Sequence, residues 1–280
     1  MTRRPKSRLP RKLPDTARER PVSTPKQPSR RDRLKDSHLA GRSARFSRDD
    51  VVRMTRALVR GERDVRLGLP PFSGLTEEHV AAATALAFGW DGNGTRARIS
   101  PSCTIEGFRS ACARMLECAR DGGRIAFATT RPASLFGVYR ALAVAASTSG
   151  ARVLSATQSG PVDRSGRRLW WVDGVAVLSD GESLVAHDSK DAADELLFVL
   201  PEPDLVVADR VFAGTAVSQG HEVIAFADLD AIALAVAAWR GMSIRLIPVD
   251  DQRPPAMYGP FLELLDEAAS ERERGGYPDE

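Results

Sequence analysis

Five aspartates stand directly after short apolar runs that predict buried strands. The aspartates are Asp209, Asp228, Asp230, Asp250 and Asp251, and the runs are Leu205–Ala208, Val223–Ala227 and Ile244–Val249. In an open α/β sheet the ligand crevice lies outside the carboxyl ends of the strands. We therefore expect three strands to bring these carboxylates to one rim, where Asp228, Asp230, Asp250 and Asp251 could hold Mg²⁺ or another divalent cation.

A polar turn earlier in the chain supplies the opposite kind of chemistry. The apolar run Ile125–Ala128 ends in Thr129, Thr130 and Arg131, and Pro132 then opens a helical segment. A strand-to-helix turn offers free backbone N–H groups and the positive end of a helix dipole, and Pro suits the first helical position. These three residues are our candidates for binding a phosphate group.

Carboxylates facing an anion-binding turn predict a metal-assisted reaction on a phosphorylated small molecule. The cation would neutralise phosphoryl charge, and one of Asp209, Asp228, Asp250 and Asp251 would act as base or nucleophile. Two structural alternatives stay open. The turn could be an ordinary βα connection that binds nothing, and Asp209 and Asp228 could be helix caps. Capping does not explain Asp250-Asp251, because Pro254-Pro255 keeps the following segment extended.

The patterning of the remaining chain predicts the elements that position these residues. Apolar runs that alternate with helical segments are typical of a parallel sheet covered on both faces. Asp173-Gly174 predicts a hairpin within a small meander, with Ser183–Ala186 as its third strand. The expected fold is α/β, a mainly parallel sheet flanked by helices in a Rossmann-like three-layer arrangement, with a helical N-terminal part.

Charge is divided unevenly along the 280 residues. Positions 1–46 carry 15 Lys/Arg against 4 Asp/Glu, which leaves 25 of the 40 basic and 33 of the 37 acidic residues to positions 47–280. We expect a disordered basic tail over 1–36, a helical region over 37–122, an α/β core over 123–270 and a polar tail over 271–280. For the basic tail we predict at most a weak electrostatic contact with nucleic acid.

Cysteine usage and hydropathy predict a cytoplasmic protein. Cys103, Cys112 and Cys118 have no metal-ligand spacing, and their odd number without a secretion signal favours reduced thiols. The late apolar run Ala231–Trp239 is too short to span a bilayer, so we expect no membrane partner. Oligomeric state has no signal in this sequence. His187 could reach the rim, whereas His221 precedes a strand at its opposite end.

From about His38 to Leu265 the chain resembles a family of actinobacterial proteins described as phosphatases. The segments that carry the resemblance are FATTRPASLFGVYRALAVAA, PDLVVADRVFAGTAVSQG, VIAFADLDAIAL and IPVDDQRPPAMYGP. The resemblance implies the α/β fold and affinity for phosphate esters.

Several family residues are replaced in this chain, and the replacements bear on turnover. The family has Gly-His for Thr130-Arg131, Asp-His for Asp209-Arg210, and a Cys-Asn-Asp-Pro run for Leu229-Asp230-Ala231-Ile232. Gln252 stands where His is common, and Ala186-His187-Asp188 represents a His-rich stretch. Arginine cannot exchange a proton near neutral pH, but Arg131 and Arg210 can bind phosphate. We therefore expect a phosphatase-like protein; the alternative is a catalytically degenerate paralogue that binds a ligand or a protein.

Overall fold

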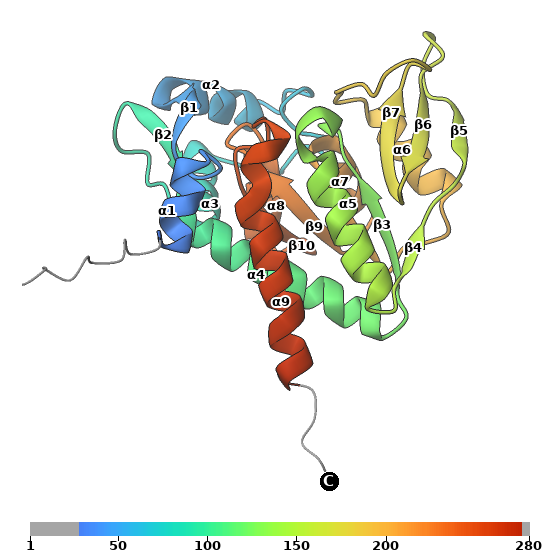
Figure 1. Ribbon diagram of the computed structural model, residues 1–280. Helices are drawn as coiled ribbons and strands as arrows, with labels where there is room; N and C mark the ends of the chain where they lie inside the picture. The colour runs from blue at the N-terminus through green and yellow to red at the C-terminus, as the bar shows by residue number, and fades with distance from the viewer. Residues whose placement is uncertain (1–27, 276–280) are drawn as a thin grey trace, which may run out of the picture.

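A twisted, mostly parallel sheet forms the centre of the molecule (Figure 1). The computed structural model describes residues 28–275. Within them the main sheet has eight strands in the order β10-β9-β8-β3-β7-β6-β5, with β4 paired to the first half of β3. Their bounds are β3 Arg124–Ala128, β4 Arg152–Leu154, β5 Gln158–Pro161, β6 Arg168–Val172, β7 Val175–Ser179, β8 Leu205–Asp209, β9 Val223–Ala227 and β10 Ile244–Pro248. The pairings from β10 through β8 to β3 and on to β4 and β7 are parallel, whereas β7-β6 and β6-β5 are antiparallel.

The chain reverses its direction of travel across the sheet between β3 and β8. From β3 it moves to β4 and the meander strands, then returns to the other side of β3 as β8 and continues outward to β9 and β10. Such a reversal is a topological switch point, and ligands bind outside the strand ends there. The turn after β3 and the residues that follow β8 therefore border the expected crevice.

Helices cover both faces of the sheet. Right-handed crossovers place helices on opposite faces when the direction of travel reverses. In agreement, α5 contacts α4 and α9 on one side, while α7 contacts α6 and α8 on the other. The bounds are α2 Arg48–Val59, α3 Glu77–Phe88, α4 Pro101–Arg120, α5 Pro132–Thr148, α6 Lys190–Val199, α7 Arg210–Ser218, α8 Ile232–Trp239 and α9 Gly259–Gly275, with a 3-10 turn at Pro255–Tyr258.

The N-terminal part contains a second, two-stranded sheet, and Arg45 on its first strand reaches the main sheet. Strands β1 (Gly41–Ser47) and β2 (Arg96–Ile99) pair antiparallel. The paired residues Arg42 and Ser47 are five positions apart on β1, whereas their partners on β2 are only two positions apart. The extra residues form a bulge, and bulges redirect side chains. The Ser43 hydroxyl accepts the backbone N–H groups of Arg45 and Phe46 at 3.2 and 3.0 Å, which fixes the bulge. Arg45 projects from it toward the ends of β9 and β10.

The expected α/β class is confirmed, and the third strand of the meander is a correction. Ser183–Ala186 does not form a strand; it contributes only a bridge between Ser179 and Leu184. The third strand is β5, which precedes the hairpin in sequence. A polar segment around Gly160 and Pro161 concealed it, because antiparallel edge strands tolerate residues that interrupt an apolar pattern.

The chain ends depart from the boundaries that we expected. Residues 30–36, assigned to the basic tail, form helix α1 (Arg30–Asp36) with Ser29 as its N-cap, and residues 1–27 lie outside the described part. Helix α9 extends to Gly275, so the predicted C-terminal tail is described only up to that residue. None of the described helices combines the length and apolarity that crossing a bilayer requires.

Close packing of a glycine in α7 against the 63–70 loop generates a stability prediction. A Cβ on Gly214 would lie 1.9 Å from the carbonyl oxygen of Leu67, whereas a Cβ on the exposed helical Gly137 of α5 meets nothing within 4 Å. We expect Gly214→Ala to lower the free energy of unfolding by about 1–3 kcal/mol, since backbone must shift. Gly137→Ala should raise it by about 0.5–1 kcal/mol through helix propensity. Urea denaturation measures both, and equal stability of the two variants would contradict the packing.

Candidate functional site at the strand ends

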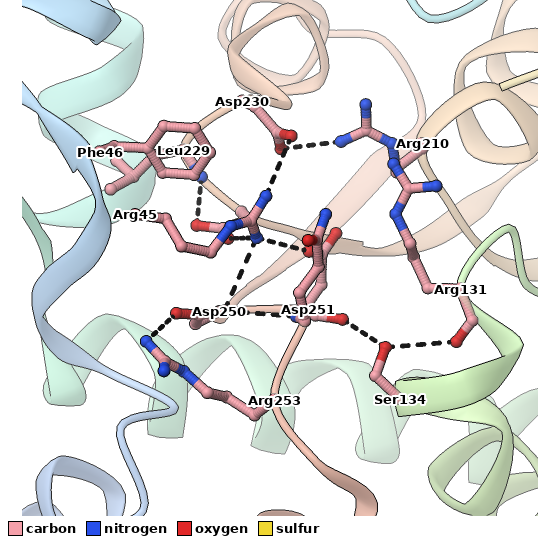
Figure 2. A network of polar contacts seen from close by, with 12 residues as sticks. Arg45, Phe46, Arg131, Ser134, Arg210, Leu229, Asp230, Asp250, Asp251 and Arg253 are labelled. Atoms are coloured by element: carbon pink, nitrogen blue, oxygen red, sulfur yellow. Dashed lines mark hydrogen bonds and ion pairs between the residues drawn. The ribbon is translucent and has the colours of Figure 1, made fainter. Parts of the chain in front are cut away.

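The guanidinium of Arg45 lies among four carboxylates at the ends of β9 and β10, three of which are labelled in Figure 2. Its nitrogen atoms approach Asp228 at 2.8 Å, Asp251 at 3.3 Å, and both Asp230 and Asp250 at 3.7 Å. These are the four aspartates predicted as metal ligands, so the prediction that they share one rim of the sheet holds. The cation among them, however, is an arginine from β1, which the sequence analysis did not single out.

Two further arginines complete the ring of charges. Arg253 pairs with Asp250, and Arg210 pairs with Asp230 at 2.8 Å. The Arg210 side chain is only 9% exposed, and its backbone has a φ of +44°, a left-handed conformation that non-glycine residues rarely adopt. Such strain persists only where surrounding contacts enforce it, and it is concentrated at functional sites.

Arg131 and Arg210 converge on a single carboxylate, that of Asp188. Arg210 donates two hydrogen bonds to it, from Nε at 2.7 Å and Nη2 at 3.0 Å, and Arg131 donates one at 3.2 Å. Arg131 follows β3 and Arg210 follows β8, so the pair spans the switch point. Burial by itself raises the pKa of Asp188, but the bonds and charges of the two arginines outweigh it and lower that pKa.

The threonines of the turn hold Asp209, which is fully buried. The Thr129 hydroxyl donates to one carboxylate oxygen at 2.5 Å, and Thr130 donates to the other through its hydroxyl at 2.6 Å and its backbone N–H at 2.8 Å. Burial raises the pKa of Asp209, although these hydrogen bonds oppose the shift. Asp209 therefore ties the end of β8 to the turn after β3, and both threonine hydroxyls are engaged in that tie.

Crowding of carboxylates changes the acidity of two members of the cluster. Burial is the largest cause that raises the pKa of Asp228, followed by the charges of Asp251, Asp230 and Asp250. Burial, together with the charge of Asp230, raises the pKa of Asp251 to about 7 against the attraction of Arg210 and Arg45. A carboxyl group with a pKa near neutrality can accept and return a proton at physiological pH.

The arrangement does not fit a metal ion as it stands. Among the described residues no group of three or more His, Cys, Asp or Glu side chains is placed to hold one. The oxygen atoms that the sequence assigned to Mg²⁺ face Arg45 instead. A cation could approach them only if that guanidinium moved, so the metal assignment stays a prediction.

Sequence reasoning missed three residues of the site, for identifiable reasons. Arg45 and Asp188 lie outside the predicted strand ends, and Arg253 lies in the turn after Asp250-Asp251, where we expected an extended segment. Of the three, only Asp188 could have been identified from the sequence, because it stands in the segment that corresponds to the His-rich stretch of the resembled family. Arg45 had none, since its position depends on an irregular pairing between β1 and β2.

The neighbour of Asp188, His187, is buried in a neutral form. Its Nδ1 accepts the backbone N–H of Ser189 at 3.1 Å, its ring packs edge-on against Phe212, and Nε2 has no hydrogen-bond partner in the described part of the chain. Burial lowers its pKa to about 4. His187 is therefore uncharged at neutral pH and does not supply a cation to the site.

This burial predicts a loss of stability in acid. The unfolded chain takes up a proton near pH 6.5, whereas folded His187 does so near pH 4. Protonation thus favours unfolding as pH falls through this window, by up to roughly 3 kcal/mol. His187→Gln should flatten the fall in unfolding free energy between pH 7 and 4.5, measured by urea denaturation. His221→Gln, at a half-buried histidine, is the control; parallel curves for wild type and His187→Gln would refute the assignment.

Comparison with known proteins agrees with the phosphatase resemblance. A family model described as "Phosphatase" matches residues 25–272. A protein named Phosphatase SCO2771, from Streptomyces coelicolor, is 30% identical over 253 residues, which cover 86% of this chain and 95% of that protein. No solved structure matches the chain. The matched range includes every residue of the site described above, and the chain belongs to the Phosphatase family.

Proposed function

We propose that this protein binds and hydrolyses the phosphomonoester of a small molecule at the switch-point crevice. One observation carries the proposal: two mostly buried arginines from neighbouring strand ends, Arg131 and Arg210, converge on one carboxylate. A carboxylate and a phosphate present similar pairs of anionic oxygens to guanidinium groups. In this proposal the phosphoryl group takes the place of the Asp188 carboxylate, which is 37% exposed and can swing away.

The open space beside Asp188 suits the rest of the substrate. A cavity of about 820 Å³ is bounded by the 63–70 loop, the segment from Asp188 to Asp191 and α7. Arg63, Arg66 and Lys190 line it alongside Asp64 and Asp191, next to apolar residues of the 63–70 loop and α7, so the lining is both charged and apolar. An organic group that carries polar substituents on an apolar frame fits such a lining.

Each predicted site residue has a distinct role in this proposal. Thr129 and Thr130 position the turn through Asp209, and Arg131 and Arg210 bind the phosphoryl oxygens. Asp228, Asp230 and Asp250 hold Arg45 on the acidic side.

Asp251 is the proposed general base, because its pKa of about 7 matches the task. It takes a proton from the attacking water as the new P–O bond forms and the ester P–O bond breaks. That proton then passes to the departing alkoxide, so the products are an alcohol and inorganic phosphate.

Binding of inorganic phosphate tests the arginine pair. Arg131→Met should weaken phosphate binding roughly tenfold or more, because a charge-assisted hydrogen bond contributes about 1.5–3 kcal/mol. Asp188→Asn should strengthen it, because the competing carboxylate is removed. Arg140→Met, which removes an exposed arginine of α5 paired with Asp173, is the control. Isothermal titration calorimetry measures all three, and equal affinities for the Arg131 and Arg140 variants would contradict the site.

Phosphate release tests turnover separately. For a panel of phosphomonoesters we expect kcat/KM to fall as pH drops below about 7, since protonated Asp251 cannot act as a base. Asp251→Asn should reduce kcat by about 10²–10⁴ while phosphate binding persists. Asp266→Asn, on the exposed side of α9, is the control.

A second candidate function is a non-catalytic phosphate binder. The observation that favours it is arginine at two positions where the resembled family has histidine, together with the buried, neutral His187. Phosphate-dependent stabilisation without phosphate release by any of the panel would establish this function in place of hydrolysis.

A further inference from the structure

We infer that Arg45 and a divalent cation are alternative, mutually exclusive occupants of the carboxylate cluster formed by Asp228, Asp230, Asp250 and Asp251. In the structure the occupant is the Arg45 guanidinium. The inference concerns the acidic side of the crevice, and it holds whether or not the protein turns over a phosphate ester.

The contacts of Arg45 are those of a cation at a shared centre. One nitrogen, Nη1, approaches Asp228, Asp250 and Asp251, and the second, Nη2, approaches Asp230. Figure 2 shows the Arg45 guanidinium between the labelled side chains of Asp230, Asp250 and Asp251. Because one positive group lies within 4 Å of all four aspartates, a second cation cannot enter without displacing it.

Charge balance explains why a divalent ion could replace Arg45. Three guanidiniums contact the four carboxylates, namely Arg45, Arg210 and Arg253. Without Arg45 only Arg210 and Arg253 remain to pair with the four aspartates, and a divalent ion such as Mg²⁺ or Mn²⁺ would supply the missing positive charge. Carboxylate oxygens are also the ligands that these ions prefer.

A separate observation indicates unused binding capacity inside the cluster. The Asp251 side chain is fully buried, and its Oδ2 has no hydrogen-bond partner among the described residues. A buried carboxylate oxygen without a donor costs free energy of the order of 1–3 kcal/mol. A guanidinium, which binds in one plane, leaves that oxygen unpaired, whereas a spherical ion can accept ligands from any direction.

Arg45 is also delivered by an element that can release it. It projects from the bulge of β1, outside the main sheet, and its side chain is 26% exposed. Its guanidinium lies over the ring of Phe46, with 4.8 Å from Cζ to the ring centroid. By contrast, the Asp251 backbone is anchored, since its carbonyl accepts the Ser134 hydroxyl at 2.6 Å.

The test compares cation binding by the full-length wild type and Arg45→Met, without any phosphate compound. We expect Arg45→Met to bind Mn²⁺ and Mg²⁺ with roughly tenfold higher affinity or more. If Arg45 occupies the cluster in about nine of ten wild-type molecules, the apparent cation affinity of the wild type is about tenfold lower. Calorimetric titration with Mn²⁺ gives the affinities, and the rise in melting temperature with Mg²⁺ is an independent readout. Arg53→Met is the matched control: it removes one exposed arginine paired with Asp50 on α2.

A second variant keeps the test decisive if Arg45→Met does not fold. Arg45→Gln removes the charge but keeps an amide donor for Asp228, and it should show the same gain in cation affinity. Arg45→Lys retains a positive charge and should respond to Mn²⁺ within about threefold of wild type, since it still fills the cluster. Equal cation affinity in wild type and the neutral variants would overturn the inference. Absence of cation binding to all of these proteins at roughly 20 mM cation would also overturn it. Either outcome leaves the phosphate-binding proposal standing, because the Arg131→Met titration tests that proposal separately.

Discussion

Compensation of buried negative charge is the constraint on which this structure depends. An ionised carboxylate inside a protein loses its hydration and must regain that free energy from positive partners and hydrogen bonds. Asp228 and Asp251 are almost completely buried at adjacent strand ends. Arg45 of β1 pairs with both of them, while Arg210 at the start of α7 pairs with the neighbouring Asp230 and Arg253 after β10 pairs with Asp250. Arg45 therefore ties the two-stranded sheet to the ends of β9 and β10.

The topology places two chemically different regions side by side at the switch point. One region contains Arg131, Arg210 and Asp188, and it offers guanidinium groups to an anion. The other is the carboxylate cluster with Arg45 in it. Asp230 links them, because it pairs with Arg210 on one side and with Arg45 on the other. A change in occupancy of one region therefore alters the electrostatic environment of the other.

In the proposed mechanism, proton transfer falls to the carboxylates, because arginine stands where the resembled family has histidine. Arg131 and Arg210 stay protonated at any physiological pH, and the burial of His187 keeps it neutral. The group near the crevice whose pKa lies close to 7 is Asp251, on account of burial and neighbouring negative charge. Membership of the Phosphatase family and this division between binding by arginine and acid–base chemistry by aspartate are mutually consistent.

The sequence alone determined where the aspartates would lie. A residue that directly follows a buried strand of a parallel sheet must lie at the carboxyl end of that strand. It also indicated the βα turn at Thr129–Pro132 and the family. Only the tertiary structure decided what those groups contact. The Thr129 and Thr130 hydroxyls bind Asp209 because β8 runs beside β3. Arg45 fills the cluster because an irregular strand pairing turns it inward, and contacts between distant segments depend on register and packing that no local pattern encodes.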